Sequence, residues 1–103
     1  MALTVGVGGW SETNPATEEI QKICDQVKVQ VEERTGNTFK EFKVIVYRSQ
    51  VVKGMNYLMK VRVGENQYFH IQVYVSLSKN VQLTGLQENH TKEDPLEPIK
   101  PFE

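Results

Sequence analysis

The sequence predicts an α+β domain in which one long helix packs on an antiparallel β-sheet of four to five strands. Apolar residues recur at helical spacing in one segment near the N-terminus, and at about every second position in the segments that follow. Turn-forming residues separate these later segments at short intervals, as in an antiparallel meander. The 103 residues correspond to one domain, so we expect residues 1–103 to form a single unit.

The helix is the most clearly patterned element. Asn14 followed by Pro15 predicts its start, because a capping side chain and a proline at the first helical position both favour helix initiation. Gly36 predicts its end. An apolar stripe, expected to cover one face of the sheet, is formed by Ile20, Ile23, Cys24, Val27 and Val31.

Four segments after the helix are rich in β-branched and aromatic residues and are predicted to be strands. They are residues 39–52, 55–63, 69–77 and 81–87. Turns are expected at Gly64–Gln67 and Ser78–Asn80. The irregular alternation at Val44–Val46 predicts a β-bulge or a local twist.

The polar members of the alternating strands are expected to face solvent. Lys60, Arg62, His70 and Tyr74 would share this polar face. Basic residues interleaved with an aromatic residue could also bind RNA, but the chain has 12 basic and 13 acidic residues and a formal net charge of −1. We therefore expect a solvated face and no nucleic-acid partner.

The two ends of the chain differ from its centre in composition. Residues 1–9 are small, glycine-rich and apolar, and are expected to form a flexible N-terminal trunk. Residues 95–103 contain Pro95, Pro98 and Pro101, which exclude a regular helix or a central strand. The last nine residues are therefore predicted to be a proline-rich C-terminal tail.

Several features favour a cytoplasmic location and no membrane partner. The start of the chain lacks the basic residues and the sustained apolar stretch of a signal peptide. No apolar run is long enough to span a bilayer. Cys24 is the only cysteine, so no disulfide can form within the chain, which suits a reducing compartment.

No combination of residues in the sequence predicts catalysis. Cys24 lies on the apolar stripe of the helix, where a buried small side chain is far more common than a nucleophile. Two histidines and one cysteine are too few for an ordinary zinc site. Gly6–Gly9 is not a phosphate-binding loop, because no strand precedes it and no Lys-Ser or Lys-Thr follows it. We predict that the protein is not an enzyme and needs no cofactor or metal.

The stretch from Gln50 to Gly54 predicts a binding surface. It forms the expected tip of a β-hairpin, where polar turn residues are usual, yet Val51 and Val52 are apolar. Exposed apolar side chains at such a tip suggest a surface that a partner covers. If Gly8-Gly9-Trp10 lies at the same end of the sheet, the two segments make a narrow apolar edge that fits a cleft.

These residues resemble the cystatin family, and in particular the stefins, which are the intracellular type 1 cystatins. Gln50–Gly54 matches the Gln-x-Val-x-Gly motif of the first cystatin hairpin, and Gly8-Gly9 stands where stefins carry their N-terminal glycine. The match extends from about Gly8 to Leu96. Further stefin-like segments are Pro15–Thr17, Asp25–Val27, Lys60–Arg62 and Phe69–Ile71.

The resemblance implies a curved sheet that grips the helix, and reversible, non-covalent, tight-binding inhibition of papain-like cysteine proteases such as cathepsins. It also implies that the N-terminal trunk and two hairpins form a wedge that enters the active-site cleft of the protease. The protease-binding residues implied in this way are Val7, Gly8, Gly9, Gln50, Val51, Val52, Lys53, Gly54, Leu77 and Ser78.

Two departures from the stefin pattern keep other functions open. Lys53 stands where alanine is common, and Ser78 replaces the usual proline of a second hairpin that is shortened here. One alternative is therefore a cystatin-fold interaction module that does not inhibit proteases. Another is a self-associating protein, because an apolar hairpin tip can open and let a monomer form a domain-swapped dimer.

Overall fold

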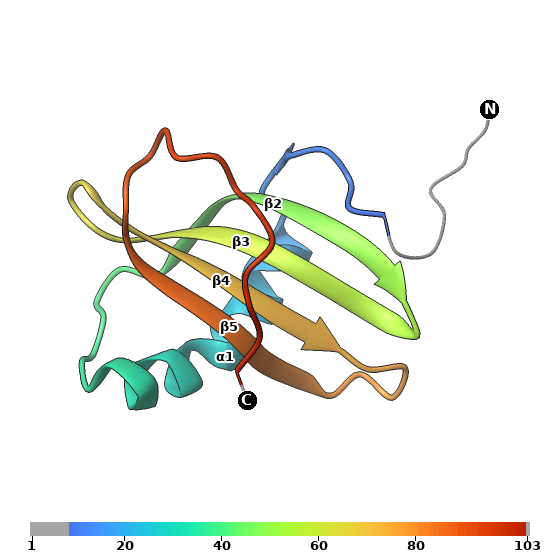
Figure 1. Ribbon diagram of the computed structural model, residues 1–103. Coiled ribbons are helices and arrows are strands. Elements are labelled where there is room, and N and C mark those ends of the chain that lie inside the picture. Colours follow the sequence, from blue (N-terminus) through green and yellow to red (C-terminus); the bar gives the residue numbers. More distant parts are fainter. Residues whose placement is uncertain (1–8, 103) are drawn as a thin grey trace.

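The computed structural model describes residues 9–102, which form one helix and one five-stranded antiparallel sheet (Figure 1). The strands lie in the order β1-β2-β3-β4-β5, so each strand pairs with its neighbours in sequence. The predicted α+β fold class is confirmed. In chain order the elements are β1 (Asn14–Pro15), α1 (Glu18–Thr35), β2 (Lys43–Val52), β3 (Gly54–Gly64), β4 (Gln67–Val75) and β5 (Val81–His90).

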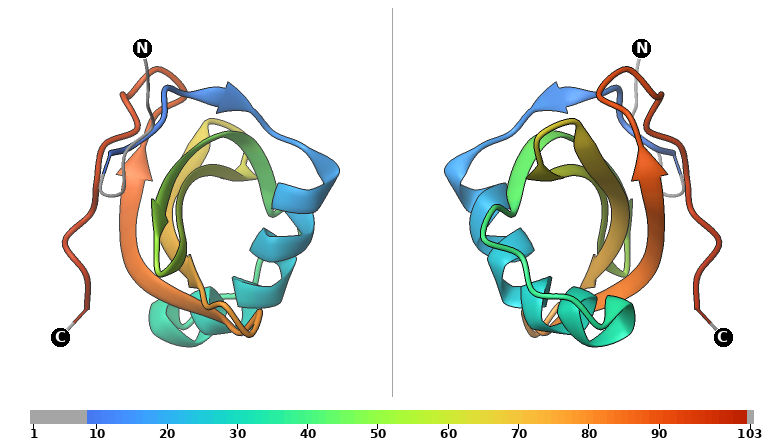
Figure 2. Two further views of the ribbon diagram at one scale, coloured as in Figure 1. Left: turned by 90° about the vertical axis from the view of Figure 1, so that its right-hand side faces the viewer. Right: turned by 90° about the vertical axis from the view of Figure 1, so that its left-hand side faces the viewer.

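The sheet is strongly curved, and its two faces are covered by different parts of the chain. Figure 2 shows α1 on the concave side and the C-terminal segment, residues 91–102, on the opposite side. We call these the inner face and the outer face. The protein therefore has three layers rather than the two that the sequence predicts.

Helix α1 begins three residues later than predicted. Thr17 is the N-cap, and its hydroxyl accepts a hydrogen bond from the backbone N–H of Ile20 at 3.2 Å. The prediction that Asn14-Pro15 starts the helix is wrong, because these residues pair with Tyr47 and Val46 as the short edge strand β1. The predicted end is confirmed, since Gly36 adopts the left-handed conformation, with φ of 73°, and closes the helix.

The strands follow the predicted segments with shifted ends. β2 begins at Lys43 rather than at Phe39, whose ring packs edge-to-face on Phe69 in the core. β4 ends at Val75, and β5 continues to His90. The predicted irregularity at Val44–Val46 is confirmed as a shift in the register between β2 and β3.

The inner face forms the main apolar core. The helix contributes Ile20, Cys24, Val27 and Val31, and each is at most 3% exposed. Burial raises the pKa of the Cys24 thiol to about 12, so the side chain is a neutral core residue at physiological pH. The sheet contributes Val44, Met59, Val61, Val63, Phe69, Ile71, Val73 and Leu83.

The outer face is buried in part, which corrects the prediction of a solvated polar face for Lys60 and His70, whereas Arg62 and Tyr74 remain partly exposed. Lys60, His70 and Gln72 are all less than 9% exposed. The C-terminal segment covers them, and its Leu96 and Ile99 pack against Leu58 in a second apolar cluster. Alternation in the sequence identified which side chains share this face but could not reveal that a distant segment covers it.

Backbone groups of the C-terminal segment bind the polar side chains beneath it. The ammonium group of Lys60 donates to the carbonyl oxygens of Lys92 and Asp94. Gln72 Oε1 accepts a hydrogen bond from the backbone N–H of Ile99 at 3.2 Å. These buried polar groups are thus compensated by hydrogen bonds, which makes their burial tolerable.

Candidate functional site

Three segments meet at one end of the sheet, on the right-hand side of Figure 1, and we call this end the hairpin end. They are the β2–β3 connection, the β4–β5 connection and the segment that precedes β1. A cross-strand row of apolar residues links the two connections on the inner face. The row is Val51, Met55, Val75 and Val81, in which each residue is directly opposite the next.

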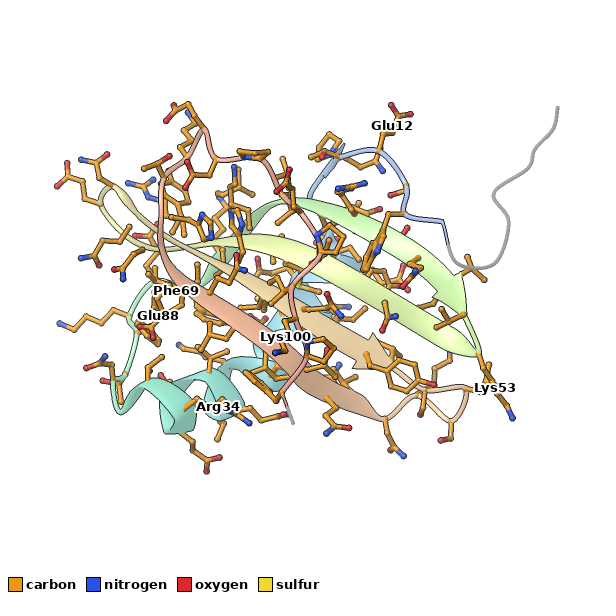
Figure 3. All side chains as sticks on the ribbon, viewed as in Figure 1. Glu12, Arg34, Lys53, Phe69, Glu88 and Lys100 are labelled. Carbon is orange, nitrogen blue, oxygen red and sulfur yellow. The ribbon has the colours of Figure 1, made fainter. Side chains whose placement is uncertain are left out.

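The first connection is a very tight bend. Val52 and Gly54 form the last pair of the β2–β3 ladder, which leaves Lys53 alone at the tip. The Lys53 side chain points away from the protein into solvent (Figure 3). Val51, two residues before Lys53, remains 41% exposed. The first hairpin therefore presents both an apolar side chain and a cation to solvent.

Gly54 has a backbone conformation and surroundings that exclude larger residues. Its φ is 106°, a region that L-residues rarely adopt. A Cβ atom at this position would lie 2.5 Å from the carbonyl oxygen of Val75 and 2.8 Å from the hydroxyl of Tyr74. Glycine here lets the bend pack directly on β4, so the motif residue has a structural reason.

The second connection is a compact polar turn. Ser76 and Asn80 close it, with the N–H of Ser76 donating to the Asn80 carbonyl at 2.9 Å and the N–H of Asn80 donating to Ser76 Oγ at 3.0 Å. Ser78 Oγ lies 3.1 Å from Ser76 Oγ within the same network. Leu77, in contrast, is 69% exposed. The turn holds its backbone through polar groups and exposes one large apolar side chain.

The segment before β1 runs beside the first hairpin. Trp10 forms an isolated antiparallel bridge with Gln50, and Ser11 N–H donates to the Ser49 carbonyl at 2.8 Å. Arg48 Nε donates to the Ser11 carbonyl at 2.8 Å. Trp10 also packs against the outer-face cluster. These contacts place Gly9 beside the first hairpin, which is the condition for a narrow apolar edge.

The structure brings together most of the predicted binding residues. Two of them, Val7 and Gly8, lie outside the described residues. The remaining eight belong to the three segments at this end: Gly9, Gln50, Val51, Val52, Lys53, Gly54, Leu77 and Ser78. The side chain of Gln50 is held by Asn56, whose amide donates to Gln50 Oε1 at 2.8 Å.

An open apolar groove of about 550 Å³ lies between this end of the sheet and the first half of α1. The whole cross-strand row lines it, together with Leu77. The helix contributes Ile23, Glu19 and Lys22. The exposed apolar surface of the hairpin end therefore continues into the protein instead of stopping at the tip.

Sequence reasoning missed one residue of this end. Tyr74 was placed with the polar face, but its hydroxyl donates to the Lys53 carbonyl and its ring lies against Gly54. The signal was the register between β3 and β4, which sets Tyr74 opposite Asn56, two residues after Gly54.

Two kinds of feature were not found in the part of the chain that the structure describes, a group of metal ligands and a helix able to span a membrane. Within residues 9–102, no three residues of the types His, Cys, Asp and Glu are grouped so that they could hold a metal ion. No helix in the same range combines the length and the apolar character needed to cross a membrane.

Comparison with known proteins assigns the chain to a family. Residues 8–95 match the cystatin domain. Cystatin-A of Bos taurus is 50% identical over 92 residues, which are 86% of this chain and 94% of the relative. Stefin-C of Bos taurus is 50% identical over 93 residues, or 87% and 92% of the two chains. Leukocyte cysteine proteinase inhibitor 1 of Sus scrofa is 50% identical over 92 residues, or 86% and 89%.

The matched region contains β1 to β5, α1 and both connections at the hairpin end. Cystatins are protease inhibitors rather than enzymes, so the prediction that the chain is not an enzyme is confirmed. The fold, the position of Gly54 and the relatives all lead to the same assignment: this chain belongs to the cystatin family and is of the stefin type.

Proposed function

We propose that this protein is a reversible, non-covalent inhibitor of papain-like cysteine proteases, including cathepsins, and that its hairpin end enters the active-site cleft. The observation that carries the proposal is that exposed Val51 and exposed Leu77 line the same groove at one end of the sheet. The relative that is named a cysteine proteinase inhibitor supports the same reading.

The chemistry of the hairpin end suits a cleft that contains a reactive thiolate. Papain-like enzymes attack a substrate carbonyl with a cysteine thiolate. A tight bend blocks approach to that sulfur without presenting an extended peptide, so no bond needs to form. The ladder contacts on both sides of Lys53 hold the bend before binding, which lowers the entropy cost of association.

The proposal is tested by titrating papain and two or three cathepsins with the protein at up to micromolar concentration. We expect near-stoichiometric, reversible loss of protease activity. Val51→Asp should weaken inhibition at least about tenfold, because a carboxylate would be buried at the interface. No inhibition by the wild-type protein at micromolar concentration would reject the proposal.

Val29 offers a matched control for this substitution. It is also an exposed valine, 60% accessible, but it lies on α1 and does not line the groove at the hairpin end. Val29→Asp should leave inhibition within about twofold of wild type. Equal weakening by both substitutions would indicate a general effect of added charge and not a contact at the hairpin end.

The N-terminal trunk is proposed to add a second contact to the cleft. Val7 and Gly8 lie outside the described residues, but Trp10 places the start of the described chain beside the first hairpin. Removing residues 1–8 should weaken inhibition mainly through faster dissociation, as most interface changes do. An unchanged dissociation rate would show that the trunk does not contact the protease.

Lys53 is proposed to select among target proteases. Its side chain is exposed at the tip, so its charge would meet the rim of the cleft first. Lys53→Ala should change the association rate in opposite directions for proteases with acidic and basic cleft rims.

A cytoplasmic location is also proposed, because a single cysteine that is buried and needs no disulfide suits a reducing compartment.

A further inference from the structure

We propose that Tyr74 is a positioning residue for the inhibitory hairpin: its hydroxyl holds the Lys53 carbonyl and so fixes the tip on β4. This inference rests on the proposed function and deepens it, because it names what keeps the bend in its binding shape. Tyr74 is on the outer face, opposite Asn56 on β3 and Gln82 on β5.

Tyr74 gives the Lys53 carbonyl a partner that the β2–β3 ladder does not provide. Val52 and Gly54 form the last ladder pair, so the carbonyl of Lys53 lies beyond the β2–β3 hydrogen bonds. The Tyr74 hydroxyl donates to this oxygen. This bond connects the tip, which lies between β2 and β3, to the next strand of the sheet, β4.

A second observation places the ring of Tyr74 against the same bend. The site of a Cβ on Gly54 would be 2.8 Å from the hydroxyl and 3.0 Å from Cε1 of Tyr74. Gly54 therefore leaves the space that the tyrosine ring occupies. The ring blocks one direction of movement of the tip, while the hydroxyl restrains the rotation of the Lys53–Gly54 peptide.

Two consequences follow for the protein's chemistry. A restrained tip loses less conformational entropy when it binds in a protease cleft, so the complex should dissociate more slowly. A restrained tip is also a poor substrate, since proteases cleave segments that can open locally. The second consequence concerns the Lys53–Gly54 bond and can be measured with trypsin, which cleaves after lysine and is not a papain-like enzyme.

The test is Tyr74→Phe, which removes only the hydroxyl, with Tyr68→Phe as the matched control. Tyr68 is on the same strand at the opposite end of the sheet, opposite Arg62 and His90. In the free protein, Tyr74→Phe should speed both amide exchange at Gly54 and native-state trypsin cleavage after Lys53 about three- to tenfold. The midpoint of thermal unfolding should stay close to that of Tyr68→Phe.

The same variant is then measured against papain. Its dissociation should accelerate about three- to tenfold with an unchanged association rate. The inference is overturned if exchange and cleavage match those of Tyr68→Phe, or if they increase while dissociation from papain does not. If the wild-type protein fails to inhibit papain, the proposed function falls, and the measurements on the free protein alone decide whether Tyr74 holds the tip.

Discussion

Both faces of the sheet carry buried clusters, and the two clusters differ in composition. The core cluster on the inner face consists of apolar residues and packs on one helix. The outer face mixes Leu58 with Lys60, His70 and Gln72, and an irregular segment covers it. The difference shows that alternating polarity identifies the faces of a strand, whereas burial depends on what else the chain places over them.

Buried polar side chains on the outer face form hydrogen bonds with the backbone of the C-terminal segment. A proline-rich segment cannot satisfy its own carbonyl and N–H groups through regular structure, so these groups remain available to side chains. Arg48 adds to this arrangement by donating to the carbonyls of Ser11 and Leu96, at 2.8 and 2.7 Å. The N-terminal segment, the sheet and the C-terminal segment are thereby joined at one side chain.

A stacked pair of histidines on the outer face includes a buried nitrogen that lacks a hydrogen-bond partner. The rings of His70 and His90 lie parallel, with centroids 3.7 Å apart, and His90 Nδ1 is 2.7 Å from Asp94 Oδ2. Among the described residues, His70 Nε2 has no hydrogen-bond partner. Burial lowers the pKa of His70 to about 4, and the nearby His90 and Lys60 act in the same direction against the opposing effect of Asp94.

The largest expected effect compares neighbours on β3 that face opposite ways. Met59 on the inner face and Leu58 on the outer face are both fully buried. Met59→Ala and Leu58→Ala should each lower the free energy of unfolding by about 2–5 kcal/mol, measured by denaturant titration. If Leu58→Ala costs less than about 0.5 kcal/mol, as exposed positions do, the outer face is not a second core.

A pH titration separates the two faces next, because only the outer face buries a histidine. The folded-state pKa of His70 is below its ordinary value of 6.5, so between pH 6.5 and about 4 the unfolded chain binds a proton that the folded chain does not. The contribution of His70 to the free energy of unfolding is therefore complete above pH 6.5 and falls as the pH drops toward 4. The loss should be on the order of 3 kcal/mol.

The control for this titration is His70→Phe, which keeps a flat ring beside His90 but cannot be protonated. Comparing the two proteins by thermal unfolding from pH 7.5 to pH 3.5 cancels the carboxylates that titrate in the same range. Parallel stability curves for wild type and His70→Phe would show that His70 is reached by solvent in the folded state.

A smaller effect on stability is expected from removing the hydrogen bond between Gln72 and the C-terminal segment. Gln72→Leu removes the acceptor for the backbone N–H of buried Ile99. An unsatisfied buried donor costs about 1–3 kcal/mol, and amide exchange at Ile99 should accelerate accordingly. Thr84→Val is a useful control. It removes the side-chain hydrogen bond from Thr84 to the Gln72 carbonyl on β4, whereas the Thr84 carbonyl still accepts the N–H of Phe102 in the C-terminal segment.

The smallest effect on stability is expected from removing a contact between the C-terminal segment and α1. The guanidinium carbon of Arg34 is 3.3 Å from the centroid of the Phe102 ring, and this contact joins α1 to the end of the C-terminal segment. Arg34→Gln should lower the free energy of unfolding by about 0.5–1 kcal/mol, the usual value of such a contact at an exposed site. An unchanged free energy would mean that the last residues contribute nothing to stability.

The helix, the four long strands and most of the candidate site could be predicted from local sequence patterns. The helical stripe from Ile20 to Val31, the stop at Gly36 and the apolar bend at Val51 are local patterns, and short-range physics decides them. The family resemblance then added the second hairpin and the trunk. The start of α1 was missed because Asn14 and Thr17 are both good caps, and only the edge pairing of β1 with β2 selects the second.

Tertiary structure alone decided what covers the outer face and what holds the hairpin tip. The C-terminal segment reaches Lys60 and Gln72 from about thirty residues away in sequence, and no local signal encodes such a contact. Gly85 makes room for it, since a Cβ there would lie 2.8 Å from Ile99 Cγ2. Tyr74 likewise meets Lys53 only after three strands are in register. Local patterns specify the elements, whereas these long-range contacts exist only once the curved sheet has formed.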